Sequence, residues 1–130
     1  MLQKLSLFCF GALGYGGLEL LYRGRTHWSM LLAGGICMVV LYGLNQKLAH
    51  WPLLVRCCAG AGLITGVEFL FGLIFNRWLC LSVWDYSACW GNLLGQICPL
   101  YSFLWFLLCI PLFFCFSFAE KHPRRSRHTA

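Results

Sequence analysis

The chain has 130 residues, of which 60% are hydrophobic and 11% are charged. Soluble domains are about 25% charged, so this composition excludes an ordinary soluble globular protein. The formal net charge of +6 comes mainly from basic residues at the ends of apolar segments and in the C-terminal tail. This distribution is typical of membrane proteins, so we expect the lipid bilayer as the partner of the chain and no nucleic acid.

Four apolar segments predict an all-α, polytopic membrane protein built as a four-transmembrane-helix bundle. Each segment is long enough to cross about 30 Å of hydrocarbon as a helix. The predicted helices cover about residues 5–22, 28–45, 53–75 and 97–119. We expect a single transmembrane domain over residues 1–119 and a basic cytoplasmic tail over residues 120–130.

The basic residues predict how the chain crosses the membrane. With four spans, the N-terminus, the middle turn and the tail share one side, and Lys and Arg are more frequent there than on the other side. Because Lys and Arg favour the cytoplasmic side, we expect a multi-pass protein of the cell (plasma) membrane with both termini in the cytoplasm. Four charged residues then lie toward the outer side: Glu19, Arg23, Arg77 and Asp85.

The first predicted span carries an acid near its end. Arg23 follows Glu19 by four residues, on the same helix face, so an ion pair is available there. Two interpretations stay open, because charges near a span end can reach the interface. Glu19 is either a span-end residue neutralised by Arg23, or both residues contribute to a binding site.

Glu68 lies well inside the third predicted span. A charged carboxylate at the centre of a membrane costs about 2.5–3.5 kcal/mol on insertion scales. We therefore expect Glu68 to be paired, protonated or facing water. It is either a binding or proton-linked site, or a structural hydrogen-bonding group between helices.

The long connection over residues 76–96 is rich in aromatic residues. Trp and Tyr favour the membrane–water boundary, so this loop is interfacial unless it dips back into the protein, where other protein groups would have to satisfy its backbone. Cys80 and Cys89 share the loop and could form a disulfide if it faces an oxidising compartment. Besides Glu68, Glu19 and Arg23, the candidate binding residues lie in or beside this loop: Arg77, Trp84, Asp85, Tyr86 and Gln96.

The two halves of the chain echo each other. Gly17-Leu18-Glu19 in the first span matches Gly66-Val67-Glu68 in the third, and Gly35-Ile36-Cys37 resembles Gln96-Ile97-Cys98. An offset of two spans predicts two repeated helix pairs related by an axis along the membrane normal, an arrangement that transporters use.

A set of short motifs carries a family resemblance. Trp84-Asp85-Tyr86-Ser87 stands between an upstream Gly66-x-Glu68 and a downstream Gly95-Gln96-Ile97-Cys98-Pro99. In these motifs the chain resembles the ABC-transporter permease family of the CmpB-like, type IV group. The resemblance implies a small multi-span membrane protein with a role in transport, and it supplies no catalytic or binding residues.

These observations predict a transporter permease-like membrane subunit whose substrate is unknown. No G-x-x-x-x-G-K-[ST] motif occurs, so the chain lacks an ATPase of its own. Since four spans are few for a complete translocation path, we expect a homo-oligomer or other membrane or ATPase subunits as partners. The alternative is a non-catalytic scaffold, assembly factor or regulatory subunit of a membrane complex. In that case we expect Glu68 to hydrogen-bond Tyr86, Ser87 or a backbone group and to hold the loop on the bundle.

We do not expect an enzyme. An acid–base or nucleophilic site needs partners within hydrogen-bonding reach, and His27 and His50 are predicted on opposite sides of the membrane. The nine cysteines form no C-x-x-C pair, and no His lies at a ligand spacing from them. We therefore predict no metal site and no cofactor.

Overall fold

The computed structural model describes residues 1–121, and these form four long helices without a β-strand. The helices are α1 (Leu2–Arg23), α2 (Trp28–Lys47), α3 (Leu53–Phe71), continued by the π-helical η1 (Gly72–Trp78), and α4 (Pro99–Lys121). All four are long and apolar enough to cross a membrane, with α3 and η1 counted as one. The predicted all-α, four-transmembrane-helix class is confirmed, whereas the basic tail lies outside the described residues from 122 onward.

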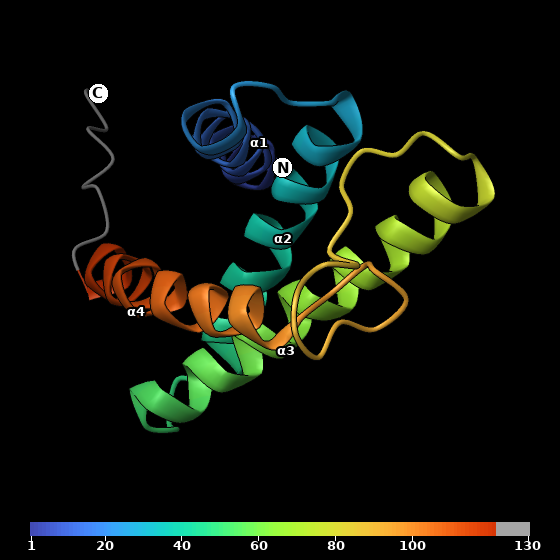
Figure 1. Cartoon of the computed structure of the whole chain (residues 1–130). Coiled ribbons are helices and arrows are strands. Elements are labelled where there is room, and N and C mark those ends of the chain that lie inside the picture. Colours follow the sequence, from blue (N-terminus) through green and yellow to red (C-terminus); the bar gives the residue numbers. More distant parts are fainter. Residues whose placement is uncertain (122–130) are drawn as a thin grey trace.

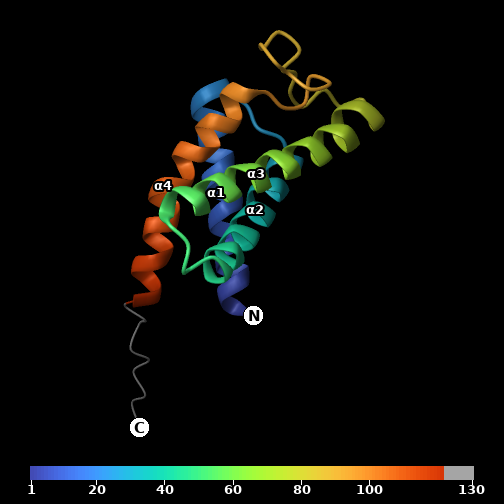
Figure 2. The ribbon, with the colours of Figure 1, turned by 90° about the horizontal axis from the view of Figure 1, so that it is seen from below.

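A tight turn joins α1 to α2. Gly24 takes the left-handed conformation, with φ of 70°, and its N–H donates to the Leu20 carbonyl oxygen at 3.0 Å, which is a common way to end a helix. His27 then caps α2, because its Nδ1 accepts from the Ser29 N–H at 3.2 Å. The short link makes α1 and α2 neighbours that run in opposite directions (Figure 2).

Glycine allows α1 and α2 to come close together. A Cβ added at Gly34 would lie 2.5 Å from the Tyr15 Cβ and 2.8 Å from the Gly11 carbonyl oxygen. Such a contact requires small residues at the crossing, as is usual between helices in lipid. The α1–α2 pair is therefore held by backbone proximity and van der Waals packing.

Helix ends near the long loop differ from the predicted ends. The third helix continues to Trp78 through η1, past the predicted end at residue 75. The fourth begins at Pro99 and not at residue 97, because the Leu93 N–H donates to the Ile97 carbonyl oxygen at 2.9 Å and holds that residue in the loop. Pro99 fits the first turn of a helix, where its missing N–H would have no helical partner.

The helices are arranged as two close pairs, α1 with α2 and α3 with α4, and α2 connects the pairs. α1 packs mainly on α2, α3 packs mainly on α4, and α2 also contacts both α3 and α4 (Figures 1 and 2). The N-terminus and the end of α4 lie at one end of the molecule, and the long loop and the α1–α2 turn lie at the other (Figure 2). Whether the two pairs are structural repeats stays a prediction.

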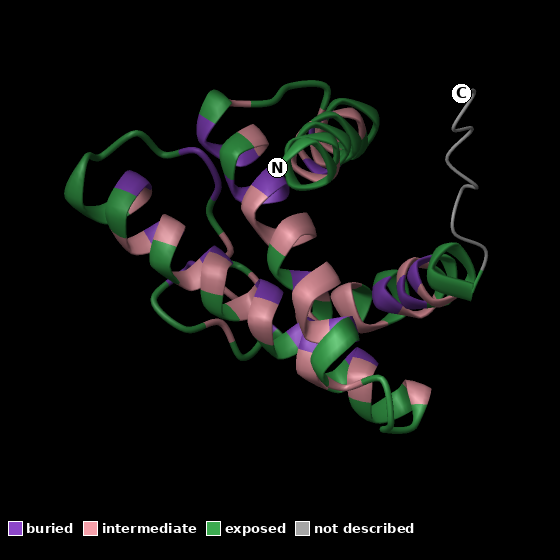
Figure 3. Cartoon of the chain, turned by 180° about the vertical axis from the view of Figure 1, so that it is seen from behind, coloured by how far each residue is buried: buried purple, intermediate pink, exposed green. Residues whose placement is uncertain are grey.

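The core consists of two apolar clusters. One, around Leu41, Cys57 and Phe113, joins α2, α3 and α4. The other contains Met30 and Phe75 together with Val83 and Trp84 of the loop. This second cluster lies at the loop end of the bundle. Figure 3 shows that buried positions gather where the helices face one another, whereas many outward positions are exposed. Large apolar side chains are common among those exposed positions, which is expected of helix faces that contact lipid.

Candidate functional site

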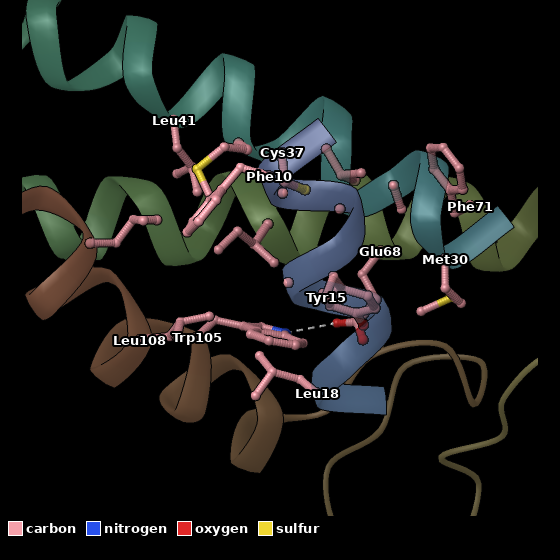
Figure 4. A pocket seen from close by; sticks show the side chains of 18 of the residues that line it. Phe10, Tyr15, Leu18, Met30, Cys37, Leu41, Glu68, Phe71, Trp105 and Leu108 are labelled. Atoms are coloured by element: carbon pink, nitrogen blue, oxygen red, sulfur yellow. Dashed lines mark hydrogen bonds between the residues drawn. The ribbon is translucent and has the colours of Figure 1, made fainter. Parts of the chain in front are cut away.

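A cavity of about 360 Å³ lies between the four helices and the long loop. Its wall includes Tyr15 of α1, Met30 of α2, Glu68 of α3 and Trp105 of α4 (Figure 4). Trp84 of the loop also lines it. The volume is within the range of about 300–1,000 Å³ that is typical of ligand pockets. Among the described residues that line the cavity, Glu68 is the one with a carboxylate, so it is the chemically distinctive group of the site.

Both carboxylate oxygens of Glu68 accept hydrogen bonds. The Tyr86 hydroxyl donates to Oε1 at 2.9 Å, and the Trp105 Nε1–H donates to Oε2 at 3.1 Å. The residue is 6% exposed. A buried carboxylate without partners would be strongly unfavourable, so these two donors are what make its position inside the bundle tolerable.

Tyr86 links Glu68 to the start of α4. Its ring stacks on that of Tyr101, with ring centroids 4.5 Å apart and an angle of 8° between the planes. Burial, together with the nearby Glu68 carboxylate, raises the pKa of Tyr86 far above its ordinary value. The hydroxyl therefore stays protonated and is available as the donor to Glu68.

Asn76 fixes the loop onto η1, the continuation of α3. Its Nδ2 donates to the Trp84 carbonyl oxygen at 3.0 Å and to Gln96 Oε1 at 2.9 Å, and its Oδ1 accepts from the Val83 N–H at 2.7 Å. The Trp84 Nε1–H in turn donates to the Gln96 carbonyl oxygen at 3.0 Å. These bonds hold the Trp84 ring, which is buried, against the cavity.

Arg23 ties α1 to the same loop. It forms an ion pair with Glu19 at 2.6 Å, and its NH1 donates to the Val83 carbonyl oxygen at 3.1 Å. The ion pair agrees with the interpretation of Glu19 as an acid neutralised by Arg23. The contact with Val83 shows that this pair also positions the loop.

The structure brings together six of the eight predicted site residues. Glu68 and Trp84 line the cavity, and Tyr86 bonds to Glu68. The others of this group belong to the adjoining hydrogen-bonded network: Glu19, Arg23 and Gln96. They connect the cavity to the loop that covers it.

Arg77 and Asp85 are not brought to the cavity. Both are exposed and neither is among its lining residues. Asp85 instead accepts the Ser87 N–H at 2.9 Å, and hydrogen bonding from Ser87 lowers the pKa of Asp85. Its observed contact is thus a turn within the loop.

Three residues that were not predicted as site residues contribute strongly. Asn76 and Trp105 supply hydrogen bonds described above, and the ring of Tyr15 lies 5.7 Å from that of Trp105 in the cavity wall. A sequence signal did exist for Trp105, because an indole N–H inside an apolar span needs an acceptor. Glu68, well inside the third span, is the acid that accepts this hydrogen bond.

The loop is buried in one part and exposed in another, and its depth in the membrane stays a prediction. Val83 and Trp84 are buried against the helices, whereas Trp78 and Trp90 are largely exposed. Cys80 and Cys89 are free thiols, so the possible disulfide between them is not formed. Within residues 1–121, no group of three or more His, Cys, Asp or Glu side chains is placed to hold a metal ion.

Comparison with known proteins agrees with this architecture. No curated protein and no solved structure compared with the chain matches it. One family model, described as "Putative ABC-transporter type IV", matches residues 6–125 and therefore all four helices, the loop and the cavity. The resemblance to the CmpB-like group is confirmed, and the chain belongs to this ABC-transporter type IV family of membrane proteins.

Proposed function

We propose that the chain is a permease-like, membrane-spanning subunit of a transporter whose ATPase is a separate protein. The observation that carries this proposal is the cavity of about 360 Å³ among all four helices, with the Glu68 carboxylate in its wall. Polar or ionisable groups inside a membrane commonly mark substrate or ion pathways. Membership of an ABC-transporter family supports the same role.

A separate ATPase is part of the proposal because the chain has no phosphate-cradling G-x-x-x-x-G-K-[ST] sequence. Energy from ATP must then come from another subunit on the cytoplasmic side. The end of the molecule that carries the N-terminus and the end of α4 (Figure 2) is the proposed side of contact with that subunit.

The test is purification of the tagged full chain from its own cells in a mild detergent. We expect a protein with a nucleotide-binding motif to co-purify and the complex to hydrolyse ATP. The Gly14→Leu variant, which would place a side chain in the cavity, should retain the partner but change the rate of ATP hydrolysis. A chain that purifies without any nucleotide-binding protein and without ATP hydrolysis would overturn the proposal.

A second candidate function is that of a non-catalytic scaffold. It is favoured by one observation: Tyr86 and Trp105 each occupy one oxygen of Glu68, so the acid joins the loop, α3 and α4. For a scaffold, only the shape of the loop surface matters, and filling the cavity with Gly14→Leu should leave complex assembly and its activity unchanged. A loss of activity with intact assembly would exclude the scaffold.

A further inference from the structure

The cavity beside Glu68 is elongated. Met30 and Leu41 both line it on α2, and the helix between them is about 16 Å long at a rise of about 1.5 Å per residue. At one end are Glu68 and Trp84, and the remaining wall is formed by apolar side chains such as Ile64 and Leu112. A space of this shape suits one extended hydrocarbon chain with a polar group at the Glu68 end.

The wall is exposed on the side of α1 and α4. Phe10 is 69% exposed, Leu18 49% and Leu108 37%, although all three line the cavity. α1 packs mainly on α2, and α4 packs mainly on α3. Because these helices are membrane spans by length and composition, the side between α1 and α4 faces hydrocarbon, and a ligand can enter there from the bilayer.

Selection among such ligands must come from the polar end. Lipid tails are as apolar as the cavity wall, so moving a hydrocarbon chain from the bilayer into the cavity gains little hydrophobic free energy. A carboxylate offers about four lone-pair positions for hydrogen bonds, and Tyr86 and Trp105 each supply one donor to Glu68. Acceptor capacity therefore remains for a further donor from a ligand.

We infer that the cavity binds a single-chain amphiphile from the bilayer, with its chain along α2 and a hydrogen-bond-donating head group, such as an amine, at Glu68. This inference deepens the proposed transport role, on which the identification of the amphiphile as cargo rests. An anionic head group is disfavoured, because it would bring a second acceptor charge to the same carboxylate.

The test uses the purified full chain in phosphatidylcholine nanodiscs and a brominated probe, 12-bromododecylamine. Bromine quenches tryptophan fluorescence on contact, and Trp84 and Trp105 line the cavity. We expect a saturable phase of quenching at a low mole fraction of the amine. At pH 8, 12-bromododecanoic acid should require at least about tenfold more probe, a difference of about 1.4 kcal/mol.

Two glycine variants on α1 provide a matched pair. Gly14 lines the cavity and Gly17 does not, and a Cβ at either position meets no atom within 4 Å. Both Gly14→Leu and Gly17→Leu should therefore fold. We expect Gly14→Leu to abolish the saturable phase and Gly17→Leu to change its midpoint less than twofold.

Quenching that rises linearly and equally in the native chain and in Gly14→Leu would overturn the inference, as would equal affinity for the acid and the amine. The nanodisc measurement needs no ATPase. Absence of an ATPase partner would thus overturn the proposed function while leaving amphiphile binding intact, and absence of saturable binding would remove the ligand class while leaving the ATPase partner intact.

Discussion

At the scale of single residues, the site depends on how one carboxylate is satisfied. Glu68 receives a donor from the loop and a donor from α4, so three separate parts of the chain meet at its two oxygens. In a low-dielectric surrounding, each such bond contributes more to stability than it would in water, and each orphaned group costs more. The bonds to Glu68 therefore influence both the stability of the bundle and the position of the loop.

Replacing Tyr86 by Phe tests this role. The ring can still stack on Tyr101, but the hydroxyl that donates to Glu68 is lost, so the free energy of unfolding should fall by about 1–3 kcal/mol. Unfolding of the purified chain, followed by a steric-trap or denaturant titration in mixed micelles, measures the change.

A matched control is Tyr22→Phe. It removes the hydroxyl from the exposed Tyr22–Tyr101 contact of 3.2 Å, and exposed changes of this kind usually stay within about 0.5 kcal/mol. If the two variants lost the same stability, the bond between Tyr86 and Glu68 would have no special weight.

At the scale of secondary-structure elements, the long loop behaves as a covering segment that is fastened from two sides. Asn76 in η1 and Arg23 at the end of α1 both bind the backbone around Val83. Gly72 lies directly beneath the Gln96 side chain, since a Cβ there would meet three Gln96 atoms. The position of Trp84 over the cavity follows from these contacts.

Asn76→Ala should release the covering segment. The Val83 N–H, which donates to Asn76 Oδ1, loses its acceptor, and the Trp84 carbonyl oxygen and Gln96 Oε1 lose a donor. Hydrogen–deuterium exchange of the Val83 amide should then be at least about tenfold faster, which corresponds to about 1.4 kcal/mol of lost protection.

Asn92→Ala is the control for this measurement, because Asn92 Oδ1 accepts from the Gly95 N–H and not from Val83. It should increase exchange at Gly95 and leave Val83 unchanged. Unaltered exchange at Val83 in the Asn76 variant would contradict the fastening role.

In this chain, sequence patterns predict the positions of the helices far better than they predict which side chains contact one another. Four long apolar segments were sufficient for the number and approximate position of the helices, because the length needed to cross hydrocarbon is a strong constraint. The need of Glu68 for a partner was also predictable, since an acid inside a span costs free energy unless it is paired, protonated or hydrated. Of its donors, Tyr86 was among the predicted partners, and its hydroxyl does donate to Glu68. Trp105 was not among them, because an indole N–H inside a span signals only that an acceptor is needed, and Trp105 lies 37 residues from Glu68 in sequence.

Two ionisable residues of the loop lie away from the cavity, and their part in binding stays a prediction. Arg77 and Asp85 were candidate binding residues because they are ionisable, yet the structure leaves both exposed. The neutral Asn76 makes more contacts that shape the site. A side-chain amide can donate and accept at once, which suits a position between a helix end and a folded-back backbone.

At the scale of the whole molecule, the two ends of the bundle differ. The loop end holds the network around Asn76 and Glu68. Near the start of α3, Arg56 donates to Asn45 Oδ1 at 2.8 Å and to Ser117 Oγ at 3.2 Å, joining α2, α3 and α4. Because the N-terminus and the end of α4 share one end (Figure 2), the excess of basic residues near them predicts a cytoplasmic location for that end.

Labelling of Cys80 tests this orientation. The thiol is exposed in the loop, so a membrane-impermeant maleimide added to intact cells should modify it, and Cys80→Ser should remove most of the signal. Cys9 is exposed on α1, where lipid should shield it, and it should react only after solubilisation. Labelling of Cys80 only in broken cells would reverse the predicted orientation.

The π-helical stretch Gly72–Trp78 affects the angle about the helix axis between Glu68, which precedes it, and Asn76, which lies within it. Glu68 and Asn76 are eight positions apart, and a regular α-helix turns by about 100° per residue, so a uniform helix would point them roughly 80° apart. Wider turns spread each revolution over more residues and reduce that offset. Deleting a single residue between them would rotate Asn76 out of phase with Glu68, so the spacing is as much a requirement of the fold as the identity of either side chain.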